Sequence, residues 1–266
     1  MTEGSPDLLV ERDGHVLTVT MNRPEARNAF SPDMLVRAAD AWKLLDEDDE
    51  LRVGILTGAG GTFCSGMDLK ALASGMPDDV QARWSEDPDM HWKALLRHFR
   101  PSKPIISAVE GYCVAGGTEI LQATEIRVAG DTAEFAIAEV QRGLFPLGGS
   151  TVRLQRQIAF TNAADLLLTG RRIRAEEAKA IGLIGHVVPA GSALEKAREL
   201  ADLVASNGPL AVKAVLRSMR ETAGMTEADG LAHEMTIGEP IIFATKDAKE
   251  GPRAFAEKRP PVFTGE

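Results

Sequence analysis

The chain has 266 residues, of which 44% are hydrophobic and 26% are charged, an ordinary composition for a globular protein with a sizeable core. This length allows one large domain, or one domain with a helical appendage. The formal net charge of -9 argues against a nucleic-acid-binding surface, although a local basic pocket for an anionic ligand is compatible with it. Two cysteines, Cys64 and Cys113, are too few for a disulfide scaffold or a zinc cluster and indicate a reducing compartment.

The N-terminal sequence MTEGSPDLLVERDG is polar and acidic and lacks the apolar core of a signal peptide. No apolar run in the chain approaches the length of a membrane span. We therefore expect a cytoplasmic protein with neither a membrane nor a nucleic acid as its partner.

The first predicted elements are two strands, residues 8–11 and 15–21, which flank the turn Asp13-Gly14 and form a hairpin. A helix is predicted to begin at Ser31-Pro32. Its apolar positions recur at helical spacing at Leu35, Ala38, Trp42 and Leu45.

Short apolar runs typical of buried strands follow at 53–57, 104–109 and 126–129, and again at 185–188, after a helix predicted at 175–181. Two of these strands end in a glycine loop that leads into a helix. This alternation predicts an α/β architecture with ligands near the strand-to-helix loops.

From about residue 192 the pattern is almost wholly helical, with apolar periodicity over 192–206, 209–222 and 226–245. Residues 74–100 differ, because this long, turn-rich and acidic segment is interleaved with tryptophans. We expect it to be irregular. It is either a substrate lid or pocket wall, or a surface excursion whose tryptophans fill gaps in the core.

Two glycine-rich stretches, 60–69 and 111–119, each run into a predicted helix. Glycine lets the backbone approach a ligand closely, and a helix start offers unpaired N–H donors at the positive end of the helix dipole. Two such donors aimed at one point would form an oxyanion hole, which indicates chemistry at a carbonyl group.

Two carboxylates, Glu119 and Glu139, lie in small or apolar surroundings near these loops. Each on its own is better explained as an acidic residue in the first turn of a helix or, for Glu139, as a helix-start or loop carboxylate at the surface. Together they are able to divide acid and base roles through different pKa values, which suits proton transfer next to a carbonyl.

Other chemistries find less support in the sequence. Cys64 and Ser65 lie in a glycine loop without the Gly-x-Ser-x-Gly pattern of a nucleophile, and no phosphate-binding glycine motif is present. The five histidines show no metal-ligand spacing, and Asp68 is most simply the N-cap of the next helix.

Five stretches together resemble the enoyl-CoA hydratase/isomerase (crotonase) superfamily, over nearly the whole chain and in the family's order. They are 22–29, 63–69, 111–119, 133–149 and 254–259. The resemblance implies a crotonase-like spiral of ββα turns over residues 1–191, the catalytic core. It also implies a helical C-terminal oligomerisation region over residues 192–266, in a homotrimer or a dimer of trimers.

The resemblance also implies an acyl-CoA thioester substrate whose carbonyl oxygen is held by the backbone N–H groups of Met67 and Gly116. Hydratases of this family pair two glutamates, which match Glu119 and Glu139, whereas many isomerases keep only the second. By analogy Glu119 would activate the water that attacks C3, and Glu139 would deliver a proton to C2. A Δ3,Δ2-enoyl-CoA isomerase and a non-catalytic acyl-CoA-binding subunit are the alternatives.

The candidate residues for coenzyme A lie in two parts of the chain. They are Arg27, Ser65, Asp68, Leu69, Lys70, Phe255 and Lys258. Neither a metal nor a separate cofactor is expected, because coenzyme A belongs to the substrate.

The stretches 115–122 and 248–259 look most like actinobacterial members of the family, some of which hydrate enoyl-CoA esters of a steroid side chain. Leu147, at a position where small residues are common, also fits an unusual acyl group. The pathway expected is fatty-acid or steroid side-chain β-oxidation.

Overall fold

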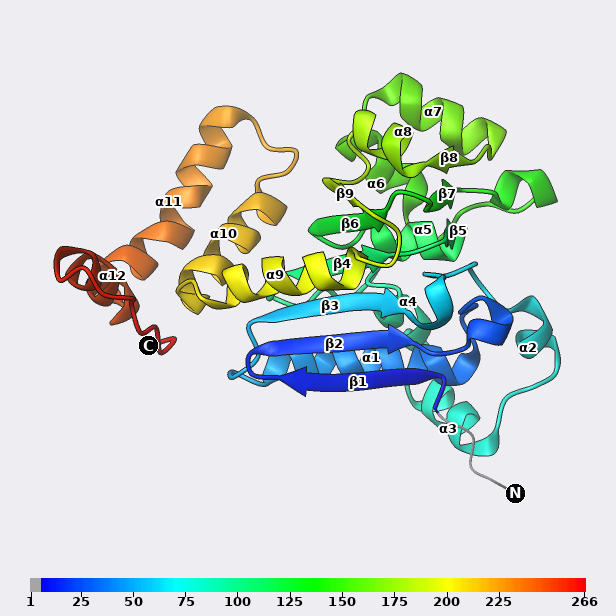
Figure 1. Cartoon of the computed structure of the whole chain (residues 1–266), viewed down its shortest axis with the longest axis horizontal. Coiled ribbons are helices and arrows are strands. Elements are labelled where there is room, and N and C mark those ends of the chain that lie inside the picture. The colour runs from blue at the N-terminus through cyan, green and yellow to red at the C-terminus, as the bar shows by residue number, and fades with distance from the viewer. Residues whose placement is uncertain (1–5) are drawn as a thin grey trace.

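A computed structural model describes residues 6–266, apart from the side chain of Leu72 (Figure 1). The first five residues of the polar N-terminal sequence lie outside the described residues. None of the helices within 6–266 combines the length and the apolar composition that a membrane span requires.

The larger of two sheets has six strands in the order β1-β2-β3-β4-β6-β9. Their bounds are β1 Leu8–Asp13, β2 Val16–Met21, β3 Val53–Gly58, β4 Ile105–Val109, β6 Ile126–Gly130 and β9 His186–Val188. The hairpin β1–β2 is antiparallel, and every other neighbouring pair is parallel. The predicted hairpin and the four predicted strands are thus confirmed.

A second sheet of three short strands was not predicted. Its order is β5-β7-β8, with bounds β5 Tyr112–Val114, β7 Glu134–Ala136 and β8 Ile173–Arg174. Strands of two or three residues are too short to show an alternating apolar pattern. Tertiary packing alone therefore determines whether such segments form strands.

Two helices cover opposite faces of the larger sheet (Figure 1). Successive residues of β3 point to opposite faces and show this. Leu56 belongs to the hydrophobic cluster that includes α1 (Pro32–Glu47), and Ile55 belongs to the one that includes α9 (Ala193–Ala205). Helix α9 contributes an alanine at every fourth position, which lets it lie close to the strands. Although predicted within the C-terminal helical region, α9 packs on the sheet of the core.

The expectation that residues 74–100 are irregular is wrong. The segment contains α3 (Asp78–Glu86) and α4 (Met90–Ala94), which both pack on α1. Trp84 and Trp92 are partly buried against the core, and Trp84 stacks on His91 at 5.4 Å between ring centroids. The tryptophans therefore fill gaps in the core, and the apolar contacts stabilise helices whose acidic, turn-rich sequence conceals them.

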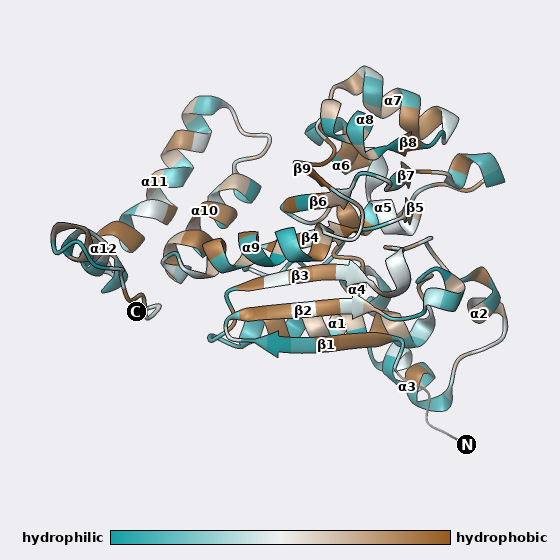
Figure 2. Ribbon diagram, viewed as in Figure 1, coloured by the Kyte–Doolittle hydropathy of each residue, from teal (hydrophilic) through white to brown (hydrophobic). Residues whose placement is uncertain are grey.

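The remaining helices connect the sheets and form the C-terminal part of the chain. Their bounds are η1 Pro24–Ala26, η2 Ala59–Gly61, α2 Leu69–Ala73, α5 Gly116–Leu121, η3 Glu139–Arg142, α6 Ser150–Gln157, α7 Phe160–Thr169, α8 Ala175–Ala180, α10 Pro209–Glu221, α11 Glu227–Ala244 and α12 Asp247–Ala256. Helices α10, α11 and α12 project from the core (Figure 1). Apolar residues of α11 alternate with polar ones on the projecting surface (Figure 2).

Candidate active site

The two glycine loops lie side by side, although almost fifty residues separate them in sequence. The N–H of Phe63 donates to the Glu110 carbonyl and that of Cys64 to the Tyr112 carbonyl, both at 2.8 Å. The Cys64 carbonyl accepts from Val114 at 2.9 Å. This strand-like pairing brings the loop that carries Met67 against the loop that carries Gly116.

Glycine is required where the two loops meet. A Cβ at Gly66, which has a φ of 98°, would lie 2.9 Å from the Ala115 Cβ and 3.2 Å from the Gly116 nitrogen. A Cβ at Gly117 would lie 2.5 Å from the Cys64 carbonyl oxygen. Any larger side chain would push the loops apart.

The backbone N–H groups of Met67 and Gly116 are available to a ligand. The residues on both sides of Met67 pair with Phe30, because the Gly66 carbonyl accepts from the Phe30 N–H and the Asp68 N–H donates to the Phe30 carbonyl. Among the turn, loop and cap hydrogen bonds of residues 6–266, none uses the N–H of Met67 or of Gly116. Two unused donors on loops that touch are compatible with the predicted oxyanion hole.

Ala115 precedes this donor in a strained conformation, with φ 51° and ψ -123°. Its N–H donates to the Ala136 carbonyl at 2.8 Å, and the Thr118 hydroxyl donates to the Cys113 carbonyl at 2.6 Å. These bonds hold a backbone geometry that costs roughly 1–3 kcal/mol and aims the start of α5 at the neighbouring loop.

Glu119, the fourth residue of α5, is only 6% exposed. The Ser150 N–H donates to its Oε1 at 3.4 Å, and Gln122 donates to the Ser150 hydroxyl at 2.8 Å. A Cβ at Gly148 would lie 2.5 Å from Glu119 Oε2, so only glycine leaves room for the carboxyl group. Burial, and next the negative charge of Glu139, raise the pKa of Glu119 to about 7.

Glu139, the first residue of η3, is half-buried, and its pKa is also raised by burial. Its Oε2 is buried without a hydrogen-bond partner among the described residues. Because the negative charge of Glu139 raises the pKa of Glu119, the two carboxyl groups lie close enough to interact electrostatically. Glu119 therefore lies in the same short helix as Gly116 and within electrostatic reach of Glu139, and the loop of Met67 meets Gly116 at Gly66.

Of the residues predicted for coenzyme A, Arg27 and Ser65 are neighbours. The Ser65 N–H donates to the Arg27 carbonyl at 3.1 Å, and the Arg27 guanidinium lies 5.3 Å from the centre of the Tyr112 ring. Lys70 follows in α2 and is exposed, as is Leu69.

Asp68 is the N-cap of α2, as its sequence predicted. Its Oδ1 accepts from the N–H groups of Lys70 and Ala71, and its other oxygen pairs with Arg23 at 2.9 Å. These contacts lower the pKa of Asp68, with the Ala71 N–H as the main cause. A carboxylate engaged in this way supports the loop before α2.

Phe255 and Lys258 lie apart from the other candidates within this chain. Phe255 is on α12, 87% exposed, and Lys258 follows that helix. Helix α12 is at the opposite end of the molecule from the two glycine loops (Figure 1). A single copy of the chain does not bring these two residues to the site.

Sequence reasoning missed Ser150 and Arg153, which surround Glu119. The Arg153 guanidinium lies 3.5 Å from the Glu119 carbonyl oxygen and 3.4 Å from that of Gly148. A serine and an arginine in an amphipathic helix carry no signal of such a role. The adjacent glycines, Gly148 and Gly149, were the only local hint of a close approach.

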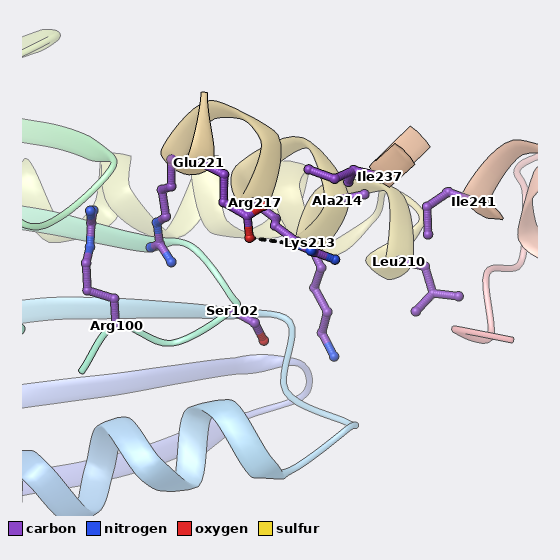
Figure 3. A pocket seen from close by; sticks show the side chains of 10 residues that line it. Arg100, Ser102, Leu210, Lys213, Ala214, Arg217, Glu221, Ile237 and Ile241 are labelled. Carbon is purple, nitrogen blue, oxygen red and sulfur yellow. Dashed lines mark hydrogen bonds and ion pairs between the residues drawn. The ribbon is translucent and has the colours of Figure 1, made fainter. Parts of the chain in front are cut away.

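A separate cavity of about 480 Å³ lies between the loop before β4 and the helices α10 and α11 (Figure 3). Arg100 and Ser102 come from the loop, and the other lining residues come from the two helices. Neither catalytic candidate, Glu119 or Glu139, lines it, so it is distinct from the candidate active site.

Comparisons with known proteins cover nearly the whole chain. Residues 11–266 match the family model described as enoyl-CoA hydratase/isomerase. The chain is 58% identical to enoyl-CoA hydratase EchA19 of Mycobacterium tuberculosis over 261 residues, 98% of this chain and 97% of that protein. It is 36% identical to carnitinyl-CoA dehydratase of Proteus mirabilis over 270 residues, 98% of this chain and 99% of that protein.

Solved structures that resemble this chain are also enoyl-CoA hydratases. Enoyl-CoA hydratase EchA1 of Mycobacterium marinum has a TM-score of 0.89 at 45% identity, over 98% of this chain and all of that one. An enoyl-CoA hydratase of Mycobacterium tuberculosis has a TM-score of 0.87 at 42% identity over the same shares. The α/β fold of the chain is therefore that of these enzymes.

Proposed function

The chain belongs to the enoyl-CoA hydratase/isomerase family, and we propose that it is an enoyl-CoA hydratase that adds water reversibly across the C2=C3 bond of a trans-2-enoyl-CoA. One observation carries the proposal. A buried carboxyl group, Glu119, and a half-buried one that raises its pKa, Glu139, accompany a pair of unused backbone donors, Met67 and Gly116.

The donors stabilise the charge that develops on the thioester oxygen. When water adds at C3, electron density moves through C2 to the carbonyl oxygen and gives it enolate character. Hydrogen bonds from Met67 and Gly116 become stronger as this charge grows, which lowers the barrier. Loss of one such donor costs about 3–4 kcal/mol of transition-state stabilisation.

The two glutamates divide the proton transfers. Glu119, as the carboxylate, accepts a proton from the water that attacks C3, and Glu139, as the acid, delivers a proton to C2. Because the pKa of Glu119 is raised to about 7, both of its forms are populated near neutral pH, as a group that accepts and returns a proton requires. One proton shared by the pair serves the reaction in both directions.

Recognition of coenzyme A is proposed to begin at the loop before α2. Arg27 and Lys70 offer positive charge there, and Ser65, Asp68 and Leu69 shape the loop. Phe255 and Lys258 are assigned to the site of a neighbouring subunit, since α12 lies far from the site of its own chain (Figure 1). Coenzyme A is part of the substrate, and the proposed mechanism uses no further cofactor.

The proposed assembly is a homotrimer or a dimer of trimers. The exposed apolar residues of α10 and α11 support it: Val215, Met219, Leu231, Met235, Ile242 and Phe243. A surface of this kind is typical of subunit contacts. The successions β4-β5-α5 and β6-β7-η3 support a spiral of ββα turns in the core.

The proposed pathway is β-oxidation of a fatty acid or of a steroid side chain. Residues 74–100, which lie against the core near Glu119 through Leu96, form one wall of the proposed acyl pocket.

The test is the loss of the conjugated enoyl-thioester absorbance in water, with short, long and steroidal trans-2-enoyl-CoA substrates. Hydration is expected with at least one of them. The Glu119→Gln variant should lose about a thousandfold in kcat, since a positioned acid or base contributes ~10²–10⁴-fold. Glu176→Gln, an exposed glutamate on α8, is the matched control and should behave as the parent.

Failure to hydrate any of these substrates would overturn the proposal. If the Glu119→Gln variant still converted 3-enoyl-CoA to 2-enoyl-CoA as fast as the parent, with Glu139 moving the proton, the protein would be an isomerase. Calorimetric binding of CoA esters without turnover would identify an acyl-CoA-binding subunit.

A further inference from the structure

Arg153 on α6 joins three segments that come from different parts of the chain. Its Nη2 donates to the Leu96 carbonyl at 2.6 Å, at the end of the segment 74–100. Its Nη1 lies 3.4 Å from the Gly148 carbonyl oxygen and 3.5 Å from that of Glu119. The short bond to Leu96 fixes the guanidinium, and the two longer contacts place it against the backbone of Glu119 and of Gly148, the residue that adjoins the Glu119 carboxyl group.

Two consecutive glycines make this placement possible, and each makes room for a different charged group. A Cβ at Gly148 would collide with the carboxyl group of Glu119. A Cβ at Gly149, which has a φ of 122°, would lie 3.2 Å from Arg153 Nη1 and 3.3 Å from its Cζ. The turn thus accommodates the carboxyl group at one residue and the guanidinium at the next.

Two acceptors of Arg153, the carbonyls of Glu119 and Leu96, lie at or just after the C-terminal end of a short helix, and the third, that of Gly148, lies in the turn before α6. The carbonyls of the last turn of a helix have no partner within it. At the end of α5, the Ala123 N–H donates to the Ile120 carbonyl and not to that of Glu119. The Glu119 carbonyl therefore remains available to accept from Arg153. Leu96, after α4, has a left-handed φ of 55°, a conformation that persists only where the surroundings hold it.

The guanidinium keeps its charge in this position. Burial lowers the pKa of Arg153 to about 10, so it is protonated at neutral pH. The charged groups that face it are Arg97, Arg100, Glu119 and Glu125. Arg97 and Arg100 disfavour its charge, whereas Glu119 and Glu125 favour it.

We propose that Arg153 is a positioning residue for Glu119, which fixes the turn 148–150 around the carboxyl group and ties that turn to the wall formed by residues 74–100. The inference rests on the proposed role of Glu119 in hydration. Arg153 itself touches no reacting atom; its geometry sets where the carboxyl group points, and its charge favours the carboxylate form.

The experiment separates geometry from charge with two variants and a control. Arg153→Lys keeps the charge and loses the planar fork, and Arg153→Met loses both. Arg156→Met removes a charge from an exposed position on the same helix and is the matched control. For each folded protein we would measure kcat, KM and the titration of Glu119 by NMR of ¹³C-labelled glutamate, with the signal assigned through Glu119→Gln.

Both Arg153 variants should lose kcat by at least tenfold with a smaller change in KM, because a displaced base no longer reaches the attacking water. In Arg153→Met the pKa of Glu119 should rise, since a nearby positive charge is removed. In Arg153→Lys it should stay near that of the parent. Arg156→Met should match the parent in all three quantities.

The inference would be overturned if Arg153→Met and Arg156→Met had the same kcat and the same titration of Glu119. If Arg153→Met does not fold, Arg153→Lys decides: a lower kcat with an unchanged titration supports the inference, and parental kcat overturns it. A parent that hydrates no enoyl-CoA refutes the proposed function instead, and the titration of Glu119 still tests the link to Arg153.

Discussion

The core around Glu119 and the projecting helices α10–α12 differ in which side chains they bury. The core buries apolar and even charged side chains, whereas the projecting helices expose many apolar ones. In the core, the buried Arg127 guanidinium donates to three backbone carbonyls, those of Gln122, Thr124 and Leu183, and to the side chain of Gln157. The projecting part is instead held to the core by polar contacts, and many of its apolar side chains face outward.

Two arginines show how the projecting part is attached. Arg220 on α10 pairs with Glu125 at 2.7 Å, and Arg52 in the core donates to the Phe263 carbonyl at 2.8 Å in the C-terminal tail. These contacts join the projecting part of the chain to the core. The core buries its apolar side chains within one chain, whereas α10 and α11 leave several of theirs exposed, which supports the proposed subunit contact.

The largest effect is expected from Gly66→Ala, which tests whether activity depends on the contact between the two glycine loops. The new Cβ would press on Ala115 and on the Gly116 nitrogen and separate the two donors, so kcat should fall by about a hundredfold or more. Gly61→Ala is the control, because Gly61 also has a positive φ, 72°, but open space around it. Steady-state hydration assays on both proteins compare them. Equal losses would mean that backbone strain, rather than the meeting of the loops, determines activity.

The core should also gain stability when its buried acid is neutralised. In the folded state the pKa of Glu119 is raised from 4.5 to about 7, so the folded protein binds the proton more tightly than the unfolded chain. The stability of the parent is therefore unaffected below about pH 4 and falls as the pH rises toward 7, by roughly 3 kcal/mol at most.

Glu119→Gln removes this dependence. Its Tm should exceed that of the parent at about pH 8 and approach it at about pH 5, as measured by thermal unfolding. Glu176→Gln, at an exposed position, should show no such pH-dependent difference. A Glu119→Gln advantage that is the same at both pH values would contradict the raised pKa.

The projecting part is tested at Phe243 on α11, which is 76% exposed. If an adjoining subunit buries this ring, Phe243→Ser removes ~1.5–3 kcal/mol per site and shifts the assembly toward smaller species in sedimentation velocity. Glu234→Ser is the control: it lies nine residues earlier, two and a half turns away, on the opposite side of the helix. If neither substitution changes the assembly, the apolar side of α11 is not a subunit contact.

The smallest effect is expected at Lys258. If it contacts a CoA phosphate in a neighbouring subunit, Lys258→Ala should raise KM by up to about fivefold and leave kcat unchanged, since an exposed ion pair contributes ~0.2–1 kcal/mol. Lys249→Ala, an exposed lysine of α12, is the control. Identical KM values for the two variants would exclude a specific contact of Lys258 with the substrate.

Sequence periodicity identified the elements that bury one continuous face. The hairpin β1–β2, the helix α1 and the helices α9 to α11 lie where their apolar residues recur at the spacing of their element. It failed at β5, β7 and β8, which are too short, and at α3 and α4, where acidic turn residues conceal helices fixed by packing on α1.

In the site, glycine loops and carboxylates in apolar settings were visible from residue types alone, and Asp68 was identified as an N-cap for the same reason. Ser150 and Arg153 were not, because their roles depend on partners at Glu119 and Leu96 that are distant in sequence.

The sequence by itself determined the α/β class, the family and the four candidate groups for chemistry, since each is recorded in local spacing or residue type. Tertiary structure alone decided that the two loops touch at Gly66 and Gly116, that Glu119 is buried beside Gly148 with a raised pKa, and that Arg153 braces it. Distances and desolvation arise only when segments far apart in the chain are packed together, and no local pattern specifies them.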